Sequence, residues 1–163
     1  GGILAWADLG LTLVSKLLGP SVMLATARFL IIDPPRLHQN TYKAFIAHFD
    51  HGDTSILAAQ HLIHKDVSQT FVIADLASSV GLSERTFLRR FVKATGYKPL
   101  EYVQQARIMK ARDALELTNR TIDDIAYSVG YSDTTAFRKI FQKITGILPT
   151  VYRQKFAVAA PGT

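Results

Sequence analysis

The chain has 163 residues, enough for one ordinary domain and a fragment of another, and 48% of them are hydrophobic, which excludes a disordered protein. It contains no cysteine, which excludes disulfides, thiolate metal sites and a cysteine nucleophile within these residues. The formal net charge is +6: residues 1–50 carry four Lys and Arg against three Asp and Glu, and residues 51–163 carry fifteen against ten.

The beginning of the chain lacks the features of a targeting segment. Residues 1–14 are apolar but have no basic leader and include Asp8, unlike a secretory signal peptide. No apolar run reaches the eighteen or so residues that a membrane span requires. We therefore expect a cytoplasmic protein with no membrane partner. The first residue is Gly1 and not methionine, which indicates a piece of a longer protein.

Residues 3–18 and 21–32 predict two helices, the first of them largely buried. The first ends at Gly19-Pro20 and the second at Asp33-Pro34-Pro35. Together they resemble the last helices of the DJ-1/PfpI-like (class I glutamine amidotransferase-like) domain. The resemblance rests on Gly1, Gly2, Ala5, Asp8, Leu9, Gly10, Leu11 and residues 17–20, 27–30 and 33–35.

This resemblance implies two extra helices from a truncated α/β domain. The strand-and-elbow part is absent, so any ligand site or nucleophile of such a domain is not on this chain. Two helices this apolar cannot bury their own surface and need a partner. They fold back on the rest of the chain, pair with a second copy or are poorly ordered; we favour a homodimer through these helices.

Residues 36–52 predict a linker in which Phe45, Ile46 and Phe49 can dock on either neighbour. Asp53 then caps a helix that turns four apolar residues inward, Ile56, Leu57, Ala59 and Ile63. Four histidines invite a metal interpretation, His48, His51, His61 and His64. Because no cysteine or well-spaced carboxylate completes a tetrahedral set, we expect solvated or locally bonded histidines, no metal and no cofactor.

One stretch of the chain occurs twice. Residues 76–91, LASSVGLSERTFLRRF, recur as residues 125–141, IAYSVGYSDTTAFRKIF, with one extra residue after Ser132 in the second copy. The match continues from Phe91, Gly96, Pro99 and Tyr102 to Phe141, Gly146, Pro149 and Tyr152. Two copies indicate a tandem pair and not a solenoid.

Each copy predicts a helix, a sharp turn and a second helix. Gly81 and Gly130 end the first helix, because glycine adopts a left-handed backbone at little cost. Ser83 and Ser132 are the predicted N-caps of the second helix. Its core face is formed by Phe87 and Phe91 in one copy, and by Phe137, Phe141 and Ile144 in the other.

The outer face of each second helix is polar. The first copy leaves Glu84, Arg85, Arg89 and Arg90, and the second leaves Asp133, Thr134, Thr135, Arg138 and Lys139. Arginine pairs bidentately with guanine, and threonine bonds bases or touches the thymine methyl group, so these helices suit the DNA major groove. The alternative is an ordinary solvated face. Two copies with matching turn, cap and core, together with the positive excess in residues 51–163, favour DNA.

Residues 99–117 between the copies predict one uninterrupted helix. Pro99 is allowed in a first turn, and one inward face is predicted, Tyr102, Val103, Ala106, Met109, Ala114 and Leu117. About eighteen residues at 1.5 Å each make a rod of roughly 27 Å, close to the roughly 34 Å turn of DNA that separates paired recognition helices. One chain would then place two helices in successive major-groove segments.

Residues from about 53 to 156 resemble the DNA-binding domain of the AraC/XylS family of bacterial transcription regulators. Residues 122–152, with Gly130, Phe137, Phe141, Gly146 and Pro149, match its signature region. The resemblance implies an all-α fold of seven helices with homeodomain-like helix-turn-helix units at about 71–96 and 121–146. The predicted organisation is residues 1–35 as the DJ-1/PfpI-like tail, 36–52 as linker, 53–156 as DNA-binding domain and 157–163 as C-terminal tail.

By position in that family, seven residues face the bases: Arg85, Leu88, Arg89, Thr134, Thr135, Arg138 and Lys139. Leu88 departs from the polar residue common there and either packs or touches a thymine methyl group. Eight further residues are predicted at phosphates or flanking positions: Ser83, Thr86, Arg90, Ser132, Thr121, Lys98, Arg107 and Lys110. For Lys98, Arg107 and Lys110 the alternative is solvated surface. Thr121 caps its helix in a capping box with Asp124, whereas its counterpart Val72 cannot; backbone phosphate contacts are expected near residues 72–74 and 121–123.

These residues are compatible with three classes of function to different degrees. A sequence-specific transcription regulator that binds double-stranded promoter DNA rests on the repeat, the faces and the charge, with RNA polymerase as a further candidate partner. An amidotransferase-like enzyme fails because the catalytic half and cysteine are missing. A dimerisation module is supported only by residues 1–35. We therefore expect a DNA-binding regulator and no catalytic residues.

Overall fold

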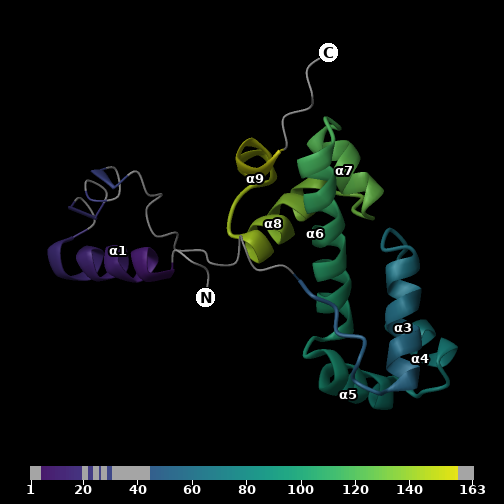
Figure 1. Ribbon diagram of the computed structural model, residues 1–163. Helices are drawn as coiled ribbons and strands as arrows, with labels where there is room; N and C mark the ends of the chain where they lie inside the picture. The colour runs from purple at the N-terminus through teal and green to yellow at the C-terminus, as the bar shows by residue number, and fades with distance from the viewer. Residues whose placement is uncertain (1–4, 20–21, 24–25, 27–28, 31–44, 158–163) are drawn as a thin grey trace. The chain divides into compact units, whose positions relative to one another are not determined.

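The computed structural model describes residues 5–19, 22–23, 26, 29–30 and 45–157 (Figure 1). The chain divides into two compact units, residues 1–39 and residues 40–163. The described residues form eight α-helices and no β-strand, which confirms the predicted all-α class. None of these helices combines the length and the apolar composition that crossing a membrane requires.

The first unit contains α1 (Ala5–Leu18), which ends before Gly19 as predicted. Leu11 is buried, but Leu13 and Leu17 are 50% and 78% exposed. The expectation of a largely buried helix is therefore wrong for α1. Much of the second predicted helix, and residues 31–44, lie outside the described residues.

The second unit contains the seven helices that the family resemblance implied. They are α3 (Thr54–Lys65), α4 (Ile73–Ser79), α5 (Glu84–Thr95), α6 (Pro99–Leu117), α7 (Ile122–Ser128), α8 (Thr134–Thr145) and α9 (Pro149–Phe156). Asp53 caps α3 as predicted, since its carboxylate accepts the backbone N–H of Ile56. Proline opens both α6 and α9, where its missing N–H leaves no helical bond unmade.

Two separate hydrophobic cores divide these helices into two modules. We call residues 54–106 the first module and residues 108–156 the second module. The first core includes Phe87, Phe91 and Tyr102, and the second includes Phe137, Phe141 and Tyr152. Ring centroids lie 5.3 Å apart in both Phe87–Phe91 and Phe91–Tyr102, and 5.6 and 5.4 Å apart in the corresponding pairs of the second module. The sequence repeat is therefore a repeat of side-chain packing.

Helix α6 belongs to both modules. Its N-terminal part buries Tyr102, Val103 and Ala106 in the first core. Its C-terminal part buries Ile108, Ala111 and Leu115 in the second core. Since a helix turns about 100° per residue, these two sets lie on nearly opposite faces of α6. The predicted single inward face is wrong beyond Ala106, and Leu117 is 73% exposed.

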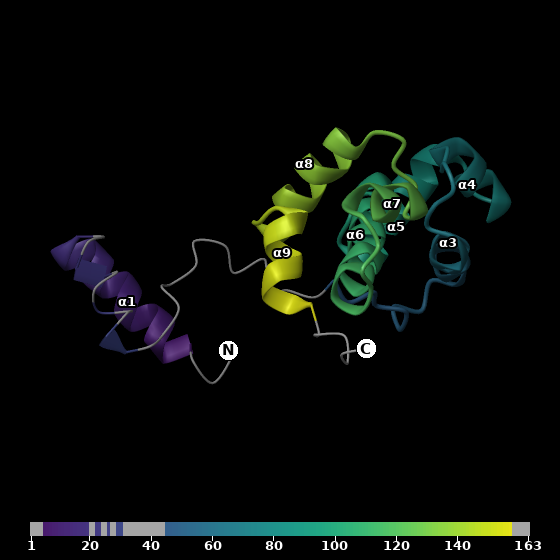
Figure 2. The same ribbon diagram turned by 90° about the horizontal axis from the view of Figure 1, so that it is seen from above.

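The C-terminal part of α6 repeats α3. Ile108, Ala111 and Leu115 stand 52 residues after Ile56, Ala59 and Ile63, and each set packs under its own helix pair. Each module is thus three helical segments followed by the first turn of a further helix, which carries the buried tyrosine. Figure 1 shows α6 as the long central helix, with α5 near one end and α7 near the other. Figure 2, seen from above, shows α8 and α9 on one side of α6 and α3 and α4 on the other.

Candidate nucleic-acid interface

The first helix-turn-helix pair consists of α4 and α5. Gly81 has φ +71° between them, the left-handed conformation that the sequence predicted. Phe87 and Phe91 anchor α5 in the core, which leaves Arg85, Leu88 and Arg89 exposed on its outer face. Ser83 is the N-cap residue but makes no cap bond, because its hydroxyl donates to Thr86 Oγ1 at 3.0 Å. The first backbone N–H groups of α5 are therefore not held by the Ser83 side chain.

Arg90 is engaged inside the first module. Its Nε donates to Asp53 Oδ2 at 2.8 Å, and its Nη2 donates to Asp53 Oδ1 at 2.6 Å. This bidentate pair lowers the pKa of Asp53 and joins α5 to the first turn of α3. A phosphate contact by Arg90 therefore has to compete with a formed ion pair.

The second pair, α7 and α8, differs at the start of its second helix. Asp133 and not Ser132 is the N-cap: its carboxylate accepts the backbone N–H groups of Thr135 at 2.8 Å and Ala136 at 3.2 Å. The predicted cap at Ser132 is wrong because the inserted residue moves the helix start one position along, where a carboxylate satisfies two donors. The insertion itself was the sequence signal for this shift.

The outer face of α8 exposes Thr135, Arg138 and Lys139, and Thr134 is half-buried. Arg138 Nη2 donates to Asp123 Oδ1 on α7 at 3.0 Å, and both side chains are about half exposed. When the two copies of the repeat are superposed, Arg85 corresponds to Thr135, Leu88 to Arg138 and Arg89 to Lys139. The same three outward positions thus hold different chemistry in the two modules.

The first helix of each pair, α4 and α7, also differs in how its N-terminus is capped. Thr121 Oγ1 accepts the backbone N–H of Asp124 at 3.0 Å and donates to Asp124 Oδ2 at 2.6 Å, which confirms the predicted cap of α7. Val72 makes no cap bond at α4, as predicted. Lys98 and Lys110 are exposed on α6 or at its start. Arg107 is half-buried and bonds three backbone carbonyl groups.

The histidines of residues 45–64 make local contacts. His51 Nε2 lies 2.8 Å from Gln60 Oε1, and His64 Nε2 lies 2.9 Å from the hydroxyl of Tyr102. The rings of Phe49 and His61 stack with centroids 5.5 Å apart. Burial lowers the pKa of His64. Among the described residues, no group of three or more His, Asp or Glu side chains has the arrangement of a metal site.

The end of the predicted linker docks on the first module. The Phe45 ring lies 5.7 Å from that of Tyr97 and 5.0 Å from that of Tyr102, measured between centroids. Ile46 remains 68% exposed. Of the three apolar residues offered for docking, Phe45 and Phe49 therefore contact the first module.

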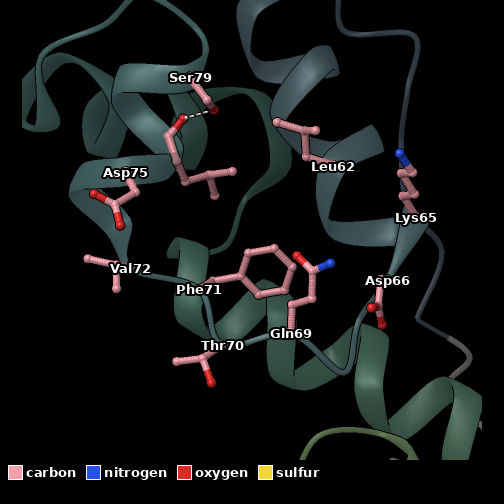
Figure 3. Close-up of a pocket in the computed structure, with 10 residues that line it drawn as sticks. Leu62, Lys65, Asp66, Gln69, Thr70, Phe71, Val72, Asp75 and Ser79 are labelled. Carbon is pink, nitrogen blue, oxygen red and sulfur yellow. Dashed lines mark hydrogen bonds between the residues drawn. The ribbon is translucent and has the colours of Figure 1, made fainter.

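A pocket of about 310 Å³ lies between the end of α3 and the start of α4 (Figure 3). Leu62, Phe71 and Val72 give it an apolar part, and Asp66 and Asp75 give it two carboxylates. Ser79 closes α4 beside it, and its hydroxyl donates to the carbonyl of Leu76 at 2.8 Å. Asp75 in the first turn of the uncapped α4 and Asp66 at the end of α3 both oppose phosphate binding in this pocket.

The chain is similar to helix-turn-helix proteins and to AraC-like regulators. Residues 76–155 match a family described as a helix-turn-helix domain. A putative AraC-like transcription regulator from Streptomyces lividans is 34% identical over 103 residues, which are 63% of this chain and 34% of that protein. The chain carries an AraC-type helix-turn-helix domain. The similar proteins are named as transcription regulators, and one solved structure as a DNA-binding domain.

A further relative aligns with nearly the whole chain. The Msm operon regulatory protein from Streptococcus mutans is 27% identical over 157 residues, which are 94% of this chain and 53% of that protein. The chain thus spans between a third and about half of the length of these relatives.

Solved structures agree with the fold. The DNA-binding domain of AdpA, determined in complex with a target DNA, matches with a TM-score of 0.60 and 27% identity over 63% of this chain and 92% of that chain. An AraC-type regulator from Chromobacterium violaceum matches with a TM-score of 0.60 and 27% identity over 67% of this chain and 96% of that chain. Both cover nearly all of the compared chain, so the AraC-type domain is present as a whole.

Proposed function

We propose that this chain reads double-stranded promoter DNA with α5 and α8 in two successive major-groove segments. The observation that supports the proposal is the duplicated module, which presents an exposed polar helix face twice from one connecting helix. Helix α6 has 19 residues, or about 28 Å at 1.5 Å per residue. That length is close to the roughly 34 Å between neighbouring major-groove segments on one side of a duplex.

The exposed residues of the two helices suit different base contacts. We propose that the exposed Arg85 and Arg89 on α5 donate to guanine, and that Leu88 makes an apolar contact to a thymine methyl group. On α8, Thr134, Thr135 and Lys139 offer a mixed polar face. Arg138 is paired with Asp123, so it reaches a base only if this ion pair breaks or if both side chains move together. We therefore propose stronger guanine selection by the first module.

Phosphate contacts are proposed at the edges of this surface. Ser83 and Thr86 present hydroxyl groups at the start of α5, and Ser132 and Thr121 do so in the second module. Lys98 and Lys110 add exposed positive charge. The start of α4 has no side-chain cap bond, so its backbone N–H groups near Val72 can donate to a phosphate. The negative charge of Asp75 in the same turn opposes this contact.

The test is selection of bound fragments from a random pool of duplex DNA, followed by titration of the selected site at several salt concentrations. We expect one site with two conserved blocks about 10–10.5 base pairs apart and an affinity that falls steeply with salt. A selected site with a single block would contradict the use of both helices. Equal binding to every sequence would contradict sequence-specific reading.

A second candidate function, self-association through residues 1–35, is favoured by the exposed leucines of α1. We propose that these residues are the tail of a DJ-1/PfpI-like domain and that Leu13 and Leu17 pack against a second copy, since patches this apolar are rarely left open to water. Sedimentation equilibrium on the chain and on a Leu13→Glu, Leu17→Glu variant tests this. A wild-type monomer at micromolar concentration would remove the proposal.

A further inference from the structure

Arg107 connects the two modules through backbone carbonyl groups. It lies in the middle of α6, between Ala106 of the first core and Ile108 of the second. Its Nε donates to the carbonyl of Val67 at 2.8 Å and its Nη2 to that of Gln69 at 2.7 Å, both in the loop after α3. Its Nη1 donates to the carbonyl of Gly130 at 3.0 Å, in the turn after α7.

The same loop and turn touch directly. A Cβ atom on Gly130 would overlap the carbonyl oxygen of Ser68 and lie 2.8 Å from both the Ser68 Cα and Arg107 Nη2. Gly130 also has φ +91°, so the turn needs glycine for its backbone conformation and for this close approach. Figures 1 and 2 both show the loop that follows α3 beside the end of α7. The modules therefore meet at a second place besides α6.

The loop is shaped for this contact by its own bonds. Asp66 Oδ1 accepts the backbone N–H of Ser68 at 3.0 Å and its hydroxyl at 2.6 Å. These bonds lower the pKa of Asp66 below its ordinary value. On the other side, the Tyr131 ring lies 5.4 Å from the Arg107 guanidinium carbon, within cation–π range.

We propose that Arg107 is a positioning residue that fixes the two modules relative to each other, and so sets the half-site spacing that the chain accepts on DNA. A single helix leaves a joint that can bend and twist, whereas a second contact held by three donors from one rigid guanidinium group removes that freedom. The spacing part of this inference rests on the proposed function. The part that concerns the modules does not, because it can be measured without DNA.

A phosphate role for Arg107, which the sequence had suggested, predicts different behaviour. A lysine at this position keeps the charge for a phosphate but cannot reach three carbonyl groups in a fixed fork. Arg107→Lys therefore separates the two roles. Arg112→Gln is the matched control, since Arg112 lies on the same helix and its Nε donates to the Tyr152 hydroxyl at 2.8 Å, in the second module.

The first measurement is the distance between the modules in solution. Because the chain has no cysteine, spin labels are introduced at Lys93→Cys on α5 and Lys143→Cys on α8, two exposed and equivalent positions. We expect one narrow distance distribution for the wild-type background and for Arg112→Gln, and a widened distribution for Arg107→Gln and Arg107→Lys. A broad distribution in the wild-type background, or an unchanged one in folded Arg107 variants, would overturn the proposal.

The second measurement uses the selected DNA site with zero, one or two base pairs inserted between its two blocks. One inserted pair should weaken wild-type and Arg112→Gln binding about tenfold or more, as a mismatched site does, but both Arg107 variants less than about threefold. Uniform weakening by Arg107→Gln at every spacing, with Arg107→Lys like wild type, would assign Arg107 to a phosphate instead. If the wild type binds no DNA, the proposed function fails while the distance measurement still decides the module contact.

Discussion

The two modules share a fold and a core but differ in how they hold the buried tyrosine that closes them. In the first module, Gln60 Nε2 donates to the Tyr102 hydroxyl at 3.0 Å, and His64 shares a bond with it. In the second module, Tyr152 donates to Glu116 Oε1 at 2.5 Å and accepts from Arg112 Nε at 2.8 Å. Neutral partners on α3 are thus replaced by charged partners on α6.

The difference extends to the surfaces that we propose face DNA. Residues 71–96 carry four Arg and Lys against two Asp and Glu, whereas residues 121–146 carry three against three. Asp133 and Asp124 occupy the starts of α8 and α7, while α5 and α4 have no side-chain cap bond. We therefore expect the first module to provide more of the electrostatic attraction to phosphates, whereas the helices of the second module are better capped.

The largest expected effect tests whether the two cores are independent. Phe91→Ala and Phe141→Ala should each lower the free energy of unfolding by about 3–5 kcal/mol, because each empties a fully buried ring position. Hydrogen exchange should show protection lost mainly in α4 and α5 for the first variant and in α7 and α8 for the second. Equal loss throughout the domain in both variants would show a single cooperative core.

Removing the buried hydroxyl group should lower the free energy of unfolding more at Tyr152 than at Tyr102. Tyr152→Phe should cost roughly 1.5–3 kcal/mol of unfolding free energy, because it leaves charged partners without their bond, whereas Tyr102→Phe should cost about 0.5–1.5 kcal/mol. Urea denaturation at neutral pH measures both. A larger cost for Tyr102→Phe would reverse the comparison.

The contribution of Tyr152 to the free energy of unfolding depends on pH. Burial first, and then the bond to Glu116, raise the pKa of Tyr152 to about 12, against an ordinary value of 10.0. The unfolded chain loses this proton first, so the stability that protonated Tyr152 contributes is complete below pH 10 and is lost as the pH rises through 12. The stability difference between wild type and Tyr152→Phe should shrink over that interval, and the phenolate absorbance should report the late ionisation.

Arg89 and Lys139 occupy equivalent positions on α5 and α8. Arg89→Ala should cost about 1–3 kcal/mol of binding free energy and relax base preference at one position, as loss of a bidentate guanine contact does. Lys139→Ala should cost less and change base preference little, because lysine lacks the fork geometry. Quantitative selection with both variants checks this. An equal loss on all DNA sequences would make Arg89 a phosphate contact.

The smallest effect concerns the helix starts. Asp133→Ala should lower the free energy of unfolding by about 1 kcal/mol, because two backbone donors lose their acceptor. Ser83→Ala should change it by only a few tenths, since Ser83 makes no cap bond. Thermal unfolding of both variants gives the comparison. A matching loss for Ser83→Ala would mean that its hydroxyl stabilises α5 through Thr86 instead.

Local signals in the sequence determined the helices and their turns. The glycines at 81, 96, 130 and 146 all have positive φ, and the predicted caps at Asp53 and Thr121 form, because these features depend on a few neighbouring residues. The repeat determined the two cores and the outward faces of α5 and α8, since the period of a helix fixes which side chains share a face. The all-α class and the type of domain followed from these features.

Only the tertiary structure decided where α6 changes its buried face, because a helix shared by two cores has no single apolar stripe for the sequence to show. It likewise decided that Arg90 pairs with Asp53, and that Arg107 holds the loop at Val67 to the turn at Gly130. These contacts join residues 23 to 40 positions apart in the chain. Pairing over such distances depends on how the modules pack, which no local pattern of residues specifies.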